Sequence, residues 1–226
     1  MIDFHIHSSF SDGDQSPQKI MEVALRRKLS AIAITDHCDI TGRFMYLRDV
    51  SKPRPLSEYI AEVRNLPPVD SLQVFLGIEI SDFSANTPPP RRFSELDFIL
   101  VETFPAQTPM QPVYNPIEKA IQLKREMPIP VGLAHPTIQH IEQYIEEIEK
   151  NNLFIELNMD KLIANPREQQ SILQKTAEIL HSAPKVKLSI GSDAHIIFII
   201  GAVKPLWDFI IRHEFLDRLI LLSVDM

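Results

Sequence analysis

The chain has 226 residues, of which 44% are hydrophobic and 23% are charged, a size and composition that fit one domain, residues 1–226, with one core. Its single cysteine, Cys38, excludes an intrachain disulfide framework and favours a reducing compartment, so we expect a cytoplasmic protein. The formal net charge of −7 argues against a broad basic face for nucleic acid, and no apolar run approaches the ~18 residues of a membrane span.

Short apolar runs bounded by turn residues predict buried parallel strands. There are about seven, at residues 2–6, 31–35, 74–80, 97–102, 130–134, 154–158 and 187–191.

Helical segments lie between most of these runs. Ser16–Pro17 and Asn165–Pro166 each pair a capping side chain with a proline at the first helical position. Ser57 can cap a helix over 57–66, and residues 141–151 form an acidic amphipathic pattern. The alternation of strands and helices implies a parallel sheet.

Two proline-rich stretches, residues 81–96 and 103–116, interrupt the alternation after strands. We expect them over the mouth of a barrel, where specificity is usually carried; ordinary rigid loops are the alternative. The apolar stretch 202–226 predicts a last helix that closes the barrel bottom, followed by a short strand. A dimer interface, and so a homo-oligomer, is the alternative for this stretch.

Side chains that bind metals stand at the ends of five of the predicted strands. They are His5 and His7 with Asp12 in the loop that follows, Asp36 and His37, Glu79, His135, and Asp193 with His195. One such residue alone is more often a cap than a ligand, but five strand ends together indicate one shared site. An open doubly wound sheet would gather its site at a single switch point, whereas a closed or nearly closed barrel brings all five ends together.

Imidazole and carboxylate together suit Zn, Mn or Fe better than Ca. Asp36 is expected to orient His37 or cap its loop, and Cys38 to be a small packing residue.

The motifs HxH with SDG, TDH, GIE, AHP and SDAH, in this order, resemble the PHP (polymerase and histidinol phosphatase) family from Ile2 to about Val203. The resemblance implies a distorted seven-stranded (β/α)7 barrel, TIM-like, that holds two or three divalent metal ions. It also implies hydrolysis of phosphate esters.

Carried over by position, the resemblance implies three groups of ligands. One ion would be held by His5, His7, Glu79 and Asp193, a second by Asp12, His37 and His195, and a third by Glu79, His135 and a histidine at the end of the fourth strand. This chain has no histidine at that last place. Either Glu102 substitutes for it, or Phe104 occupies the position and leaves the third site weak or empty.

Metals bridged by Glu79 and by a water would make a bridging hydroxide the nucleophile. We assign catalytic roles to His195, Asp193 and His135, and either histidine could protonate the leaving alkoxide.

Arg43, Arg91 and Arg92 are candidates for contacts to the substrate phosphate, with simple surface solvation as the alternative. The expected function is therefore a metal-dependent phosphoesterase acting on a small phosphorylated metabolite or nucleotide. A non-catalytic metal-binding docking domain and a metal-dependent amide or lactone hydrolase are the alternatives.

Overall fold

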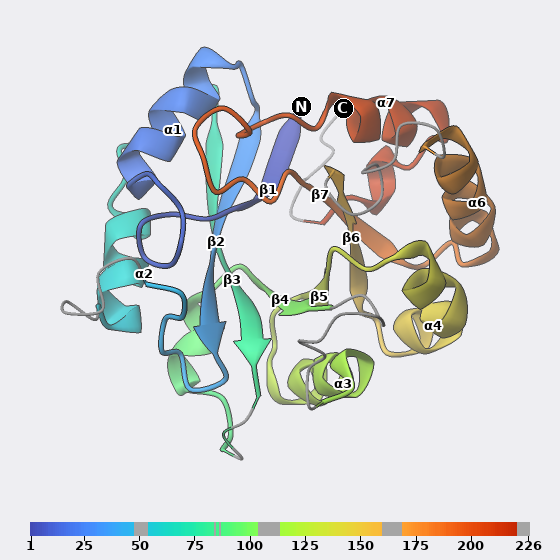
Figure 1. Ribbon diagram of the computed structural model, residues 1–226, viewed down its shortest axis with the longest axis horizontal. Helices are drawn as coiled ribbons and strands as arrows, with labels where there is room; N and C mark the ends of the chain where they lie inside the picture. Colours follow the sequence, from blue (N-terminus) through green and yellow to red (C-terminus); the bar gives the residue numbers. More distant parts are fainter. Residues whose placement is uncertain (48–53, 84, 86, 104–113, 160–168, 221–226) are drawn as a thin grey trace.

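The computed structural model describes residues 1–47, 54–83, 85, 87–103, 114–159 and 169–220, and in these it alternates strands with helices (Figure 1). The strands are β1 (Ile2–Ile6), β2 (Ala31–Asp39), β3 (Gln73–Asp82), β4 (Phe98–Glu102), β5 (Val131–Ala134), β6 (Phe154–Asn158) and β7 (Lys187–Gly191). The helices are α1 (Pro17–Arg26), α2 (Leu56–Arg64), α3 (Pro116–Glu126), α4 (Ile138–Lys150), α6 (Gln169–Ser182) and α7 (Lys204–Arg212), with short 3-10 helices η1 (Arg91–Glu95) and η2 (Leu216–Arg218).

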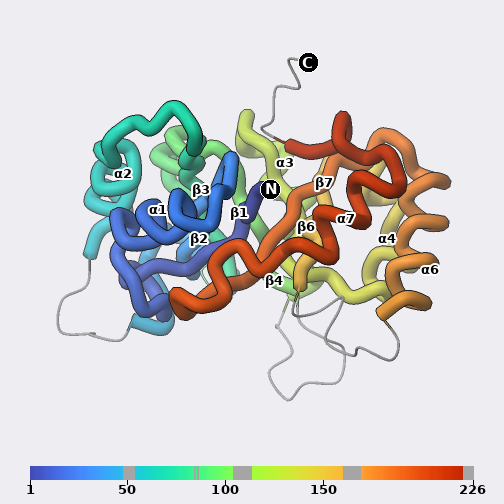
Figure 2. Tube along the Cα trace, turned by 90° about the horizontal axis from the view of Figure 1, so that it is seen from above, coloured from blue at the N-terminus to red at the C-terminus, as the bar shows by residue number. Residues whose placement is uncertain are grey.

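The strands form one parallel sheet whose order follows the chain from β1 to β7. Its two outer strands meet beyond their ends, where Ile6 forms a parallel bridge with Ala194 and His7 N donates to Ala194 O at 2.9 Å. Helices surround the strands in both views (Figures 1 and 2). The predicted seven-stranded (β/α)7 barrel is confirmed, and the open doubly wound sheet is wrong.

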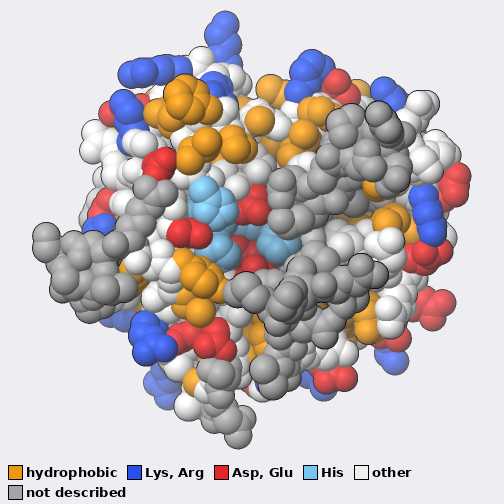
Figure 3. All heavy atoms as spheres, viewed as in Figure 1, with side chains coloured by type: hydrophobic (Ala, Val, Ile, Leu, Met, Phe, Trp, Pro, Cys, Tyr) orange, Lys and Arg blue, Asp and Glu red, His pale blue; other side chains and the backbone are white. Residues whose placement is uncertain are grey.

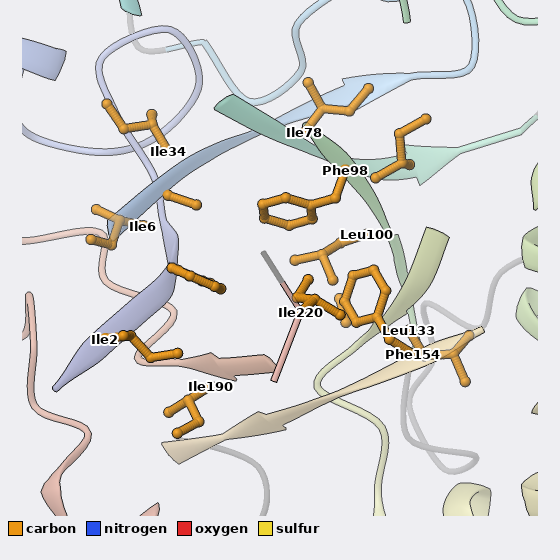
Figure 4. Packing of buried hydrophobic residues seen from close by; sticks show 14 of the residues in the cluster. Ile2, Ile6, Ile34, Ile78, Phe98, Leu100, Leu133, Phe154, Ile190 and Ile220 are labelled. Carbon is orange, nitrogen blue, oxygen red and sulfur yellow. The ribbon is translucent and has the colours of Figure 1, made fainter. Parts of the chain in front are cut away.

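Aliphatic and aromatic side chains from the strands fill the interior (Figure 4). Phe98 and Phe154 meet edge to face with ring centroids 5.9 Å apart, and Ile6, Ile34 and Ile190 are fully buried in the same cluster. Because strands of a barrel are covered by side chains inside and helices outside, continuous apolar runs mark them in the sequence.

The predicted strands agree with the observed ones within two residues, except at the end of β2. This strand continues to Asp39, and β3 continues to Asp82. In the longer pairing His37 lies directly opposite Glu79. The extension therefore brings two predicted ligands side by side.

The predicted helix starts have mixed outcomes. Ser16 caps α1 as expected, because its side chain accepts a hydrogen bond from Lys19 N. The predicted Ser57 cap is wrong: α2 begins at Leu56, and Pro55, whose φ of −76° suits a helix entry, precedes it without a side-chain cap.

Two further helix predictions concern later parts of the chain. The acidic helix begins earlier than expected, at Ile138, since Thr137 and His140 form a capping box. Asn165–Pro166 lies outside the described residues.

The end of the described chain returns to the barrel, and most of the predicted short strand lies outside the described residues. After α7, Leu219 makes a single parallel bridge with Leu188, and Ile220 N donates to Leu188 O at 2.9 Å. Ile220 lies among the core side chains in Figure 4. Of the proline-rich stretch 103–116, most residues lie outside the described part of the chain.

Among the described residues, no helix combines the length and apolarity needed to cross a membrane.

Tyr59 anchors α2 to the sheet through its buried hydroxyl, which lies 2.8 Å from both Ile34 O and Gly77 O. Removing that hydroxyl leaves buried carbonyls without their donor. We expect Tyr59→Phe to lower the free energy of unfolding by about 1–3 kcal/mol in urea denaturation. Tyr144→Phe, on the half-buried face of α4, is the matched control and should change it by less than about 0.5 kcal/mol.

Candidate metal centre

The side chains at the carboxyl ends of the strands converge in one cluster. A first group joins β1 to the segment after β7: His5 Nε2 and His7 Nε2 lie 3.0 Å apart, and His7 Nε2 lies 3.1 Å from Asp193 Oδ1. Each of these residues offers a donor atom within 4.8 Å of the others. Glu79 Oε2 lies 3.1 Å from His5 Nε2, so the four residues expected around one ion are together.

A second group surrounds Asp12 and is more open to solvent. Asp12 Oδ2 lies 3.2 Å from His195 Nε2 and 3.9 Å from His37 Nε2. His7 joins this group, with its Nδ1 at 3.8 Å from Asp12 Oδ1. The cluster thus contains the expected trio and places His7 between the two groups.

A third group contains the residue that stands in place of the missing histidine. His37, Glu79 and Glu102 each offer an atom within 4.8 Å of the others. His135 approaches from another side, with Nε2 3.0 Å from Glu79 Oε1. Glu79 is therefore in contact with donors from β1, β2 and the end of β5.

Glu102 is buried against this cluster rather than turned to solvent. Burial, and next the negative charge of Glu79, raise the pKa of its carboxyl to about 7. Ser81 hydrogen-bonds one side of the carboxyl, whereas Oε2 is buried without a partner among the described residues. A buried oxygen of this kind can serve as a ligand.

The electrostatics of the cluster fit a bound cation. Burial alone would lower the pKa of His5, but Glu156, Glu79 and Asp193 hold it well above the ordinary value. Burial alone would raise the pKa of Glu79, but His37 and His5 hold it well below. Burial lowers the pKa of His37 to about 4 and also lowers the pKa of His7, so without metal the balancing protons lie on His5, His135 and His195.

The geometry of the ring nitrogens points the same way. His5 Nε2 and His7 Nε2 face each other, and His7 Nδ1 is buried without a hydrogen-bond partner among the described residues. A divalent ion would take lone pairs from several of these atoms at once and displace the extra protons. The donor set is therefore one that divalent metals accept.

Buried carboxylates outside the predicted ligand set fix the loops that carry it. Asp36 in β2 accepts from Ser8 N at 2.9 Å and Ser11 N at 3.0 Å, and so holds the loop after β1. Asp3 in β1 accepts from Ser192 N at 2.9 Å, and so holds the loop after β7. Of the two roles expected for Asp36, orienting His37 or capping a loop, these contacts agree with capping a loop.

Sequence reasoning missed Glu156 and Ser81. Glu156, fully buried in β6, lies 2.9 Å from His5 Nδ1, and Ser81 Oγ lies 2.6 Å from His37 Nδ1. The sequence does contain a signal for Glu156: it stands in the middle of the apolar run FIELN, and a buried carboxylate needs partners. No local signal distinguishes Ser81.

The three arginines lie at the surface. Arg43, with a side chain 78% exposed, pairs with Asp39 at 3.1 Å. Arg91 and Arg92 belong to η1, which leads into the amino end of β4, and Arg92 pairs with Glu95 at 3.5 Å. Their contacts to a phosphate stay predictions. Cys38 is buried in the core, as expected of a packing residue.

The cluster is visible from outside the molecule. Figure 3 shows histidine and acidic side chains gathered at the centre of one face, with hydrophobic side chains next to them. The His195 side chain is 35% exposed, whereas the side chains of His5 and His7 are fully buried. A small molecule could therefore reach the cluster on the side of His195.

The fold and the cluster define a class: a nearly closed parallel barrel with imidazole and carboxylate donors at the carboxyl ends of its strands. A family model described as PHP domain matches residues 3–104. This match covers 102 of the 226 residues, just under half of the chain.

Solved structures share the fold. A histidinol phosphate phosphatase from Lactococcus lactis subsp. lactis, complexed with zinc, L-histidinol and phosphate, superposes with a TM-score of 0.60 and 16% identity over 94% of this chain and 93% of that one. A Listeria monocytogenes protein, described provisionally as a histidinol phosphatase, superposes with a TM-score of 0.54 and 14% identity. The superposition covers 92% of this chain and 100% of that one.

A curated relative also matches in sequence. An uncharacterized protein of Methanocaldococcus jannaschii is 27% identical over 158 residues, which are 69% of this chain. The match spans 66% of the length of that relative, just under two thirds.

The metal-free protein should lose stability as the pH rises above neutrality. Burial would lower the pKa of His135 and His195, but hydrogen bonds to Glu79 and Asp12 raise each to about 9. Their stabilising contribution is therefore complete below about pH 6.5 and lost as the pH rises through about 9.

We expect the free energy of unfolding of chelator-treated protein to fall across this window in urea denaturation. His195→Gln should flatten part of the slope. A stability that rises from pH 6.5 to 9 would contradict the assignment.

Proposed function

We propose that this protein is a metal-dependent hydrolase of phosphate esters. The observation that carries the proposal is the convergence of imidazole and carboxylate donors from six strands, or the segments that follow them, at one open end of the barrel. The match of residues 3–104 to the PHP domain model supports it, and so does the Lactococcus lactis enzyme of like fold, which is complexed with zinc and phosphate. Zinc, manganese or iron would suit the donor set.

We assign one ion to His5, His7, Glu79 and Asp193, a second to Asp12, His37 and His195, and a third to Glu79, His135 and Glu102. When bound, such ions supply a Lewis acid for the phosphoryl oxygens and an activated water. Glu79 lies between the three sets, since its two oxygens contact His5, His37 and His135. It is thus the carboxylate suited to bridging.

His195 is the candidate for delivering a proton to the leaving group, a role that it can fill only while its Nε2 is not bound to the second ion. Its Nδ1 donates to Asp193 O at 2.8 Å, which fixes the ring, and its Nε2 faces Asp12 at the open side. His135 has only 6% of its surface exposed and lies against Glu79, so it is less accessible to a leaving group. Asp193 contributes by holding His7 and His195 in place.

The substrate we propose is a small phosphorylated metabolite or nucleotide. A pocket with several carboxylates attracts a phosphate only when cations offset their charge, so metal would be required for binding as well as for chemistry. Arg43, Arg91 and Arg92 stay candidates for outer contacts to a longer substrate.

Removal of a central donor should abolish turnover. In protein reconstituted with Mn²⁺ or Zn²⁺, we expect His7→Ala and Asp193→Ala each to lower kcat/KM for p-nitrophenyl phosphate by more than about 100-fold. A loss of up to about 100-fold is typical when the changed residue only supports a metal ligand, so the loss of a ligand itself should be larger. Circular dichroism should show the fold retained. Asp70→Ala, at an exposed loop, is the matched control and should keep full activity.

A panel of phosphate, carboxylate ester, lactone and amide substrates separates the alternatives. Turnover of amides or lactones alone would replace the phosphoesterase proposal by the amide or lactone one. Stabilisation by metal without turnover of any substrate would favour a docking domain.

Glu102 should account for one bound ion. We expect elemental mass spectrometry to find one ion fewer per chain in Glu102→Ala than in the wild type, and Glu102→His to restore it. Glu126→Ala, exposed on α3, is the control. Equal metal content in Glu102→Ala and wild type would mean that Glu102 holds no ion.

A further inference from the structure

Glu156 is a fully buried carboxylate to which no role has been assigned so far. Both of its oxygens are used: Oε1 lies 2.9 Å from His5 Nδ1 and accepts from Asn158 Nδ2 at 2.8 Å, and Oε2 accepts from His135 N at 2.6 Å. It therefore contacts two predicted metal ligands, which come from β1 and from the end of β5.

The contact with His5 determines which ring nitrogen is available. An ionised carboxylate only accepts hydrogen bonds, so His5 Nδ1 carries the hydrogen and donates it to Glu156. The lone pair of the neutral ring is then on Nε2, the atom that faces His7 and Glu79. A carboxylate behind a ligating imidazole fixes the tautomer and raises its basicity.

The contact between Glu156 and His5 lies beside a position of the sheet that has no side chain. Gly191, on the neighbouring strand β7, has no side chain, and a Cβ there would lie 2.0 Å from Glu156 Oε1 and 2.4 Å from His5 Cβ. The glycine makes room for the glutamate and the imidazole to meet. The absence of a side chain at this one position of β7 thus serves the contact.

The second contact holds a strained backbone. His135 has a φ of +36°, which is rare for a residue other than glycine and costs of order 1–3 kcal/mol. The hydrogen bond from His135 N to Glu156 Oε2 stabilises this conformation, in which His135 Nε2 reaches Glu79.

We propose that Glu156 is a positioning residue that sets the donor geometry of His5 and His135 for metal. The inference rests on the metal site of the proposed function. Asp3 and Asp36 are buried carboxylates too, but their hydrogen bonds go to serines and backbone N–H groups rather than to a ligand ring. If the role of Glu156 were purely structural, it would only stabilise the fold, as Asp3 and Asp36 do by holding loops.

The test is the affinity for Zn²⁺, measured by competition with a chromophoric chelator. In Glu156→Gln the side chain keeps its size, but its amide NH₂ must face either His5 Nδ1 or His135 N, both of which need an acceptor. We expect zinc to bind about 10- to 100-fold more weakly. Glu149→Gln is the matched control: Glu149 Oε1 also accepts from a backbone group, Lys185 N, before the amino end of β7, and this variant should bind zinc as the wild type does.

Thermal unfolding with and without Zn²⁺ separates positioning from structure. We expect the rise in Tm caused by zinc to shrink in Glu156→Gln. Equal losses of Tm in both states, with zinc affinity within threefold of wild type, would overturn the proposal.

Long-range ¹H–¹⁵N NMR of the zinc-loaded wild type gives a test that needs no variant. His5 should show a protonated Nδ1 and a metal-bound Nε2, and the reverse assignment would overturn the inference even if Glu156→Gln did not fold. If the wild-type protein bound no zinc, the metal site itself would be overturned. If the wild type and Glu156→Gln bound zinc with the same affinity, only the role of Glu156 would be overturned.

Discussion

The structure depends on the burial of many titratable groups at one end of the barrel. Away from water, each carboxylate and each imidazolium would be costly alone, so each needs a partner of opposite charge. Glu79 illustrates this, because its fully buried carboxylate lies against the rings of His5, His37 and His135, and its pKa is held well below the ordinary value. The same requirement explains why divalent cations suit the cluster.

The barrel meets this constraint by using neighbouring strands to fix one another's loops. Asp36 in β2 holds the loop after β1, Asp3 in β1 holds the loop after β7, and Glu156 in β6 holds the residue after β5. In each case a buried carboxylate on one strand accepts backbone N–H groups from the loop beyond the adjacent strand. These hydrogen bonds fix the backbone of loops that carry predicted ligands, and a metal site requires ligands held in place.

Glu102 marks where this chain departs from the family resemblance. It reaches the cluster from the end of β4, beside His37 and Glu79, where a histidine was expected. A carboxylate differs from an imidazole in charge, and its raised pKa of about 7 reflects the cost of adding another negative group beside Glu79. Binding of an ion would relieve that repulsion, so metal occupancy and the ionisation of Glu102 are linked.

The sequence by itself determined the strands and most of the candidate cluster. Buried parallel strands are apolar on both faces, so runs such as 31–35 and 154–158 were recognisable. Polar residues that end such runs, His37 and His135 among them, stood out as candidates for the site. These signals are local, because each depends on a residue and its near neighbours in the chain.

Only the tertiary structure decided which side chains support the cluster. Ser81 and Glu156 gain their roles from partners 44 and 151 positions away, His37 and His5, and no local pattern states what lies across the barrel. The buried hydroxyl of Tyr59 likewise fixes α2 on the sheet through carbonyls of β2 and β3, a contact that the local pattern of the helix does not state. Local periodicity determines the elements, whereas the contacts that orient a buried ligand form only when distant strands pack together.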